Sequence, residues 1–267
     1  MIPPLAAEPM FFIGNFAVTN TMINAWVAVV FFIVVALMIS RKRADVPRGL
    51  QNVVEWLLEA GLNFAESVTG NREQAKRFFP LAMTIFLFVL FSNWLGLLPG
   101  TGSIGVFQLN HGEVELIPLL RPASSDLNLT LAMASFSILM THLFGVFAIG
   151  VWRHANKFVN IRGVVHALSK GPMAIVVALI EFLVGLIELV GEAAKTLSLS
   201  LRLFGNVFAG EVLLTVLSGM LAFGLPIPVY FLELLVGVIQ AMVFAVLVLA
   251  FAAVATMEPH GDAETVH

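Results

Sequence analysis

Long apolar runs, separated by shorter polar segments, form the dominant pattern of this chain. A run of about 20 apolar residues is what an α-helix needs to cross a bilayer. The pattern therefore predicts an all-α integral membrane protein with about five transmembrane helices. We treat residues 1–267 as a single membrane domain, with spans at about 21–39, 78–98, 127–152, 172–220 and 228–257.

The last two apolar runs are longer than a bilayer requires. Residues 172–220 built as one helix would measure roughly 70 Å at the usual rise per residue, whereas the hydrocarbon core is about 30 Å thick. An ordinary tilt of about 20° does not absorb this difference. Gly224, Pro226 and Pro228 interrupt the pattern between the two runs. The sequence therefore predicts a hairpin of two long, strongly tilted helices.

A weaker, amphipathic pattern covers residues 47–70. Its polar residues recur every three or four positions, which places them on one face of a helix. This polar face is acidic, unlike the basic face of most interfacial helices. Two interpretations stay open: a helix on the membrane surface, or a helix covered by its neighbours. The residues of the polar face are Asn52, Glu55, Glu59, Asn63 and Glu66.

The distribution of basic residues predicts how the chain crosses the membrane. Seven Lys and Arg residues lie within 41–77 and four within 153–170, whereas Arg121 is the one basic residue between the second and third spans. Because cytoplasmic loops are enriched in Lys and Arg, both groups are placed in the cytoplasm. Five spans then put the N-terminus outside and the C-terminus inside. Cysteine is absent, which excludes disulfides and thiolate metal sites.

Arg202 lies deep inside the fourth apolar run. A charged side chain at the bilayer centre costs from about 3 to more than about 10 kcal/mol, and arginine does not lose its proton in proteins. Arg202 must therefore face protein, water or a counter-charge. The other charged residues before it are spaced so that all five fall within about an 80° arc of the helix. They are Glu181, Glu188, Glu192 and Lys195.

A second polar face begins at Glu211, nine residues after Arg202 and hence half a turn around the helix. In the predicted hairpin, Glu211 and Glu233 have the same depth, and Gln240 lies level with Asn206. Ionisable groups inside a membrane usually mark a path for protons or ions. By contrast, His142 stands alone in the third span, and we interpret it as a packing residue.

Four segments resemble subunit a of F-type ATP synthases, the stator half of a rotary ion channel. The most specific is SLSLRLFGNVFAGE, Ser198–Glu211, and the others are SNWLGLLPG at Ser92–Gly100, DLNLTLAMA at Asp126–Ala134 and IQAMVF at Ile239–Phe244. The resemblance extends from the first span to the last. It implies two tilted helices beside a ring of c subunits, each c subunit presenting one carboxylate.

The resemblance also implies roles for individual residues. Arg202 would face the ring and separate two aqueous half-channels. The implied partners are the c-ring, the b subunits of the peripheral stalk and the other synthase subunits, with no nucleic acid, no cofactor, no metal and no catalytic site in this chain. The implied location is a bacterial inner membrane. The outer half-channel would contain Asn93, Asn206, Glu211, Glu233 and Gln240, and the inner one Glu188, Glu192 and Lys195.

One position departs from the family pattern, and other functions stay open. Many members pair a histidine with a glutamate where this chain has Glu211 and Glu233. Which of the two relays protons, and whether the ion is a proton or sodium, is therefore open.

The main alternative is a secondary transporter with a midplane site, which would require an internal repeat that we do not find. An intramembrane enzyme would need paired aspartates or a nucleophile with its base, and no Asp lies in any predicted span.

Overall fold

The computed structural model describes residues 4, 6–41, 47–98, 100–101, 104–110, 113–158, 172–220, 224 and 226–257. Within these residues, five helices are long and apolar enough to cross a membrane. The prediction of an all-α integral membrane protein is therefore confirmed. The five helices are α1 (Asn20–Arg41), α3 (Arg72–Gly96), α4 (Leu127–Ile149), α7 (Pro172–Met220) and α8 (Pro226–Ala255).

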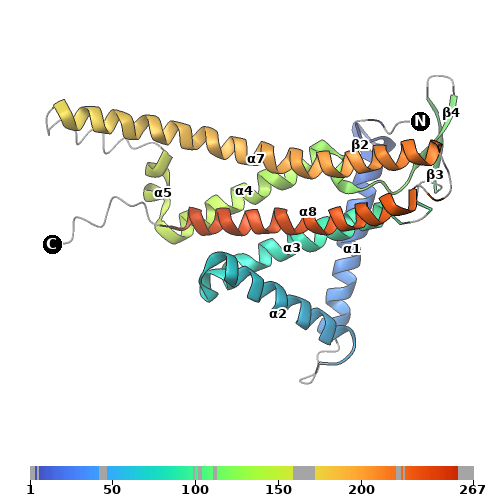
Figure 1. Cartoon of the computed structure of the whole chain (residues 1–267), viewed down its shortest axis with the longest axis horizontal. Helices are drawn as coiled ribbons and strands as arrows, with labels where there is room; N and C mark the ends of the chain where they lie inside the picture. The colour runs from blue at the N-terminus through green and yellow to red at the C-terminus, as the bar shows by residue number, and fades with distance from the viewer. Residues whose placement is uncertain are drawn as a thin grey trace.

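Figure 1 shows α7 and α8 running side by side, while α1 lies steeply across them. Helix α3 packs along α8, and α4 packs against both α7 and α8. The amphipathic α2 (Leu50–Thr69) packs against α3. The buried core lies where α3, α4, α7 and α8 meet, and its members are Ile85, Val89, Ala134, Leu199, Leu203, Ala241, Phe244 and Val248.

Polar side chains cap the helices and fix their junctions. Asn71 accepts a hydrogen bond from the backbone N–H of Glu73 at 2.8 Å and so begins α3. Asp126 accepts one from the backbone N–H of Asn128 at 2.9 Å and begins α4. The same aspartate accepts a hydrogen bond from Thr21 Oγ1 at 3.1 Å. Because Thr21 belongs to α1, this contact ties the first helix to the start of α4.

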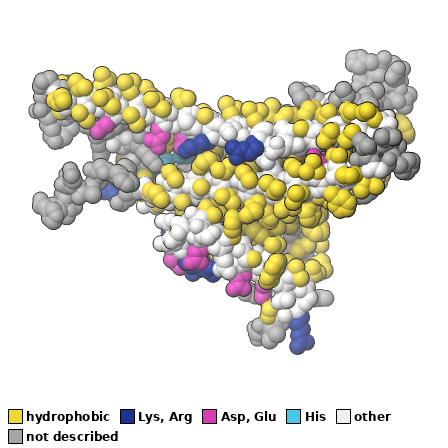
Figure 2. Space-filling view, in the orientation of Figure 1, with side chains coloured by type: hydrophobic (Ala, Val, Ile, Leu, Met, Phe, Trp, Pro, Cys, Tyr) yellow, Lys and Arg dark blue, Asp and Glu magenta, His cyan; other side chains and the backbone are white. Residues whose placement is uncertain are grey.

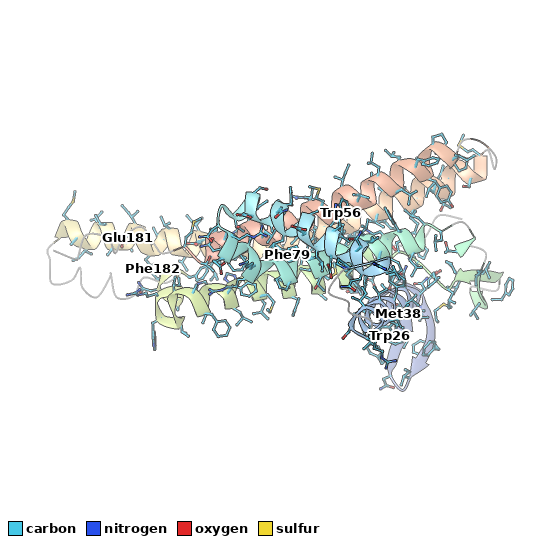
Figure 3. The ribbon with its side chains drawn as sticks, turned by 90° about the horizontal axis from the view of Figure 1, so that it is seen from below. Trp26, Met38, Trp56, Phe79, Glu181 and Phe182 are labelled. Atoms are coloured by element: carbon cyan, nitrogen blue, oxygen red, sulfur yellow. The ribbon has the colours of Figure 1, made fainter. Side chains whose placement is uncertain are left out.

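The first part of α7 extends beyond the rest of the bundle (Figures 1 and 3). Figure 3 labels Glu181 and Phe182 on this extension. Its large apolar side chains are widely exposed, for example Ile187 at 70% and Val190 at 69%. An apolar helix surface of this kind is stable only against lipid or another protein. Trp26 on α1 and Trp56 on α2 are also exposed.

Two features differ from the sequence prediction. Two antiparallel hairpins occur where no strand was expected: β1 (Pro9–Ile13) with β2 (Phe16–Thr19), and β3 (Gly105–Asn110) with β4 (Glu113–Pro118). The third span, expected to run to about residue 152, ends as helix α4 at Ile149. Gly150 then adopts φ 89°, and a separate helix α5 (Val151–Phe158) begins. Glycine enters this left-handed region without the steric cost that other residues meet.

Candidate functional site

Two contacts between α7 and α8 define the centre of the site. Asn206 Nδ2 donates a hydrogen bond to Gln240 Oε1 at 2.7 Å. One turn further along α7, Gly210 lies directly against Glu233, and a side chain at this glycine would overlap the Glu233 carboxylate. The predicted proximity of Gln240 to Asn206 is thus confirmed. Together the contacts show that α7 and α8 run antiparallel here.

A pocket of about 350 Å³ opens beyond Gly210, and we call it the charged pocket. Glu211 and Glu233 both line it, as predicted from their common depth. It also contains groups from α3, from the segment before α4 and from the N-terminal residues. Its polar and charged lining residues are Glu8, Asn93, Thr101, Arg121, Glu211, Thr215, Tyr230 and Glu233.

Arg121 is a residue of this pocket that was not predicted to belong to the site, because its position between two spans indicated only the topology. Its side chain is only 2% exposed. Its Nε donates to Glu211 Oε1 at 2.8 Å, and its Nη2 donates to Glu211 Oε2 at 3.0 Å. Further hydrogen bonds reach the carbonyl oxygens of Pro4 at 2.9 Å and Ala6 at 3.3 Å. Glu211 therefore meets its charge partner within this chain, in a bidentate pair.

Asn93 and Glu233 form the buried wall of the charged pocket. Asn93 is 2% exposed and Glu233 7% exposed. Neither side-chain polar atom of Asn93 has a hydrogen-bond partner among the described residues. The indole of Trp94 holds α3 in place here, because its Nε1 donates to the carbonyl oxygen of Leu234 at 3.2 Å. The pocket thus presents polar groups that the surrounding protein leaves available.

Arg202 lies on the exposed side of α7 and lines a different pocket, of about 290 Å³. We call this the Arg202 pocket. Lys195 and Ser198 line it from α7, and Leu247 and Phe251 from α8. Figure 2 shows basic side chains along α7 within a surface that is otherwise largely apolar. Along α7, Asn206 with its hydrogen bond to Gln240 lies between Arg202 and the residues that line the charged pocket. Arg202 and Glu211 therefore belong to separate polar spaces.

A third group of ionisable residues lies beside the Arg202 pocket. Lys195 Nζ is 2.6 Å from Glu192 Oε1, and its ammonium lies 5.1 Å from the centre of the Phe251 ring. Glu192 Oε2 is also 3.5 Å from His142 Nε2. His142 is therefore not isolated, because its partner is supplied by another helix, whereas the interpretation of His142 as a packing residue stays a prediction.

The structure also places the two remaining acidic residues of α7. Glu188 is half-buried one turn before Glu192, on the same helix face. Glu181 lies further out, on the extension of α7, and is exposed. The charged residues that were predicted to share one face of α7 thus extend from Glu181, outside the bundle, to Arg202. Among the described residues, no group of His, Asp or Glu is arranged to hold a metal ion.

The helices and pockets define a polytopic membrane protein with ionisable groups along a helix pair. The sequence model of the family described as "ATP synthase A chain" matches residues 22–253. The chain therefore belongs to this family of membrane-embedded synthase subunits.

Similar proteins cover nearly the whole chain. ATP synthase subunit a of Moorella thermoacetica is 30% identical over 91% of this chain and 94% of its own length. ATP synthase subunit a 1 of Syntrophotalea carbinolica is 33% identical, covering 89% and 86%. The subunit a of Mycobacterium ulcerans is 34% identical, covering 87% and 85%. The resemblance identified from the Arg202 segment is confirmed.

Proposed function

We propose that this chain is the stator subunit that conducts protons through the membrane sector of a rotary ATP synthase. Its family supports a proton-translocating role. The observation that carries the detailed mechanism is the position of Arg202, exposed on α7 and separated from Glu211 by the Asn206–Gln240 hydrogen bond. A fixed positive charge that lines one polar space, separated by this hydrogen bond from the other, lets protons enter through one space and leave through the other without crossing directly between the two.

The charged pocket serves as the outer half-channel in this proposal. A buried amide that finds no partner in the protein needs water as its partner, so Asn93 supports a hydrated pocket. Glu233 carries protons across it, because its carboxylate reaches the α7 surface at Gly210. Glu211 is held by Arg121 and sets the charge of the pocket instead. The proposed proton relay of this pocket is therefore Glu233 rather than Glu211.

Arg202 meets its counter-charge in trans. Each c subunit of the ring brings one carboxylate past the exposed face of α7. An arginine–carboxylate pair at about 4 Å is worth roughly 4 kcal/mol at an effective dielectric near 20. Moving one charge across 100 mV yields about 2.3 kcal/mol. The pair is thus strong enough to keep the passing carboxylate ionised and weak enough for the ring to move on.

The Arg202 pocket and the residues around Glu192 form the inner half-channel. The exposed apolar face of α7 supports contact with a ring of helices rather than with solvent.

If α1 crosses the membrane upright, its steep crossing of α7 and α8 in Figure 1 gives those two helices the strong tilt that their length requires. The N-terminus then lies outside a bacterial inner membrane and the C-terminus inside, where the b subunits of the peripheral stalk approach.

Purification and reconstitution test this function against a transporter that works alone. The tagged chain should copurify with c subunits and an ATP-hydrolysing head. Vesicles with the whole complex should make ATP after an acid–base jump, and vesicles with the chain alone should not take up any solute coupled to protons. Recovery of the chain as a lone, active carrier would contradict the proposal.

A further inference from the structure

A cluster of ionisable side chains joins α4, α5 and α7. Figure 1 shows α5 at the opposite end of the bundle from β3 and β4. His142 comes from the second half of α4, and His154 from α5. Glu192 and Lys195 come from α7. We call these four residues the histidine cluster. The two residues from α7 lie at least 38 residues beyond the two histidines in the sequence, so the fold is needed to bring the two pairs together.

His142 is the bridge within this cluster, because a partner lies at each of its ring nitrogens. Its Nδ1 is 3.2 Å from His154 Nε2. Its Nε2 is 3.5 Å from Glu192 Oε2. An imidazole held in this way can accept a proton at one nitrogen and release a proton from the other. Histidine also changes its charge close to neutral pH, which suits repeated transfer.

The cluster is connected to Arg202 through Lys195. Glu192 Oε1 is 2.6 Å from Lys195 Nζ. Lys195 in turn lines the Arg202 pocket together with Arg202 itself. A line of polar groups therefore connects the Arg202 pocket, where a rotor carboxylate would pass, with His154 on α5. Among the described residues, the titratable groups in contact with His142 are Glu192 from α7 and His154 from α5, while Lys195 contacts Glu192.

We propose that His142 transfers the protons of the inner half-channel between Glu192 and His154, an inference that rests on the proposed function. During synthesis, the Glu192 carboxylate takes a proton released into the Arg202 pocket. The Glu192 O–H bond then breaks as a bond forms to His142 Nε2. The proton on His142 Nδ1 passes to His154 Nε2, which leaves His142 neutral with its proton on Nε2 and His154 with one proton more. His154 then releases a proton to water, and His142 returns to its starting tautomer before the next transfer. No electrons are exchanged, and the reverse sequence serves ATP-driven pumping.

A structural role for the same residues is the competing explanation. The ring of Phe158 lies 5.6 Å from both imidazoles, centre to centre, so packing alone could hold the cluster together. Phe158 has no titratable group. The Phe158→Leu variant therefore disturbs the packing while leaving the proton-binding groups in place, and it is the matched control.

The experiment measures ATP-driven proton pumping by the assembled complex in vesicles. His142→Gln keeps a side chain of similar reach that cannot take up a proton, and we expect pumping to fall at least tenfold while the complex still assembles. His142 is 26% exposed, so free imidazole can reach its site. Imidazole added to His142→Ala should restore pumping severalfold. Phe158→Leu should pump at close to the normal rate, with no response to imidazole.

Normal pumping by His142→Gln would overturn the relay. So would a loss that imidazole does not restore, or an equal loss in Phe158→Leu, since both indicate a packing role. Arg202→Ala, measured alongside, keeps this failure distinct from failure of the proposed function. If Arg202→Ala abolishes synthesis while His142→Gln does not, only the relay is lost. If Arg202→Ala retains coupled synthesis, the proposed function itself fails.

Discussion

Arg121 and Glu211, 90 residues apart in the sequence, form a buried bidentate ion pair in which Nε lies 2.8 Å from Oε1. The arginine comes from the segment before α4, and the glutamate comes from α7. The pair therefore joins the C-terminal part of α7 to the segment that connects α3 and α4. It also gives Glu211 a charge partner within this chain, which is why the proposed function assigns proton transfer to Glu233.

Removing one partner of this pair should destabilise the protein strongly. Arg121→Met leaves Glu211 charged in a largely buried site, and breaking such a pair costs about 3–5 kcal/mol. Replacing both residues, with Arg121→Met and Glu211→Gln together, should restore much of this stability. The thermal unfolding temperature of the purified complex is the measurement.

The exposed pair of Arg72 and Glu66 supplies the control for this prediction. Their side chains are 39% and 42% exposed. An exposed ion pair contributes at most about 1 kcal/mol, so Arg72→Met should leave the unfolding temperature nearly unchanged. Equal effects of the two single substitutions would show that burial of Arg121 does not matter.

Glycine is required at position 210 because the Glu233 carboxylate occupies the space that a side chain at this position would need. Gly210→Ala should displace Glu233, and overpacking of this kind costs about 1–3 kcal/mol. We expect ATP-driven proton pumping to fall about tenfold, since about 1.4 kcal/mol corresponds to a factor of ten. The shorter Glu233→Asp, combined with Gly210→Ala, should recover part of the rate.

Gly219→Ala is the matched control, because a side chain there meets nothing within 4 Å among the described residues. Pumping by this variant should stay near normal. If Gly210→Ala also pumps normally, Glu233 does not need its position against α7.

The Asn206–Gln240 hydrogen bond should act as part of the barrier between the two pockets. Gln240→Ala removes the partner of Asn206 and opens space between α7 and α8. We expect passive proton leakage through the membrane sector to increase several times, measured in vesicles with an imposed potential. Ile239→Ala, at an adjacent position that is 51% exposed, should not leak. Tight vesicles with Gln240→Ala would place the barrier elsewhere.

The sequence predicts helices well here because apolar runs of membrane length have few alternative structures. It also predicts that Gln240 lies near Asn206, because helix periodicity and the position of the turn between the last two spans are sufficient for that inference. It does not predict the role of Arg121, because counting basic residues in loops treats it as a topology signal. The partners of His142 come from α5 and α7, and a pattern within a single helix contains no information about them. Both hairpins form outside the predicted spans, in segments where no strand was expected.

The most direct test of the account is ATP synthesis driven by a proton gradient in vesicles that contain the complex with Arg202→Ala. Leu201→Ala, a substitution at the adjacent exposed residue of α7, serves as the control. We predict an assembled complex that hydrolyses ATP but makes none, because no positive charge would hold a rotor carboxylate ionised at this position. Leu201→Ala should make ATP at close to the normal rate. Normal, gradient-dependent ATP synthesis by the Arg202→Ala complex would contradict the central claim.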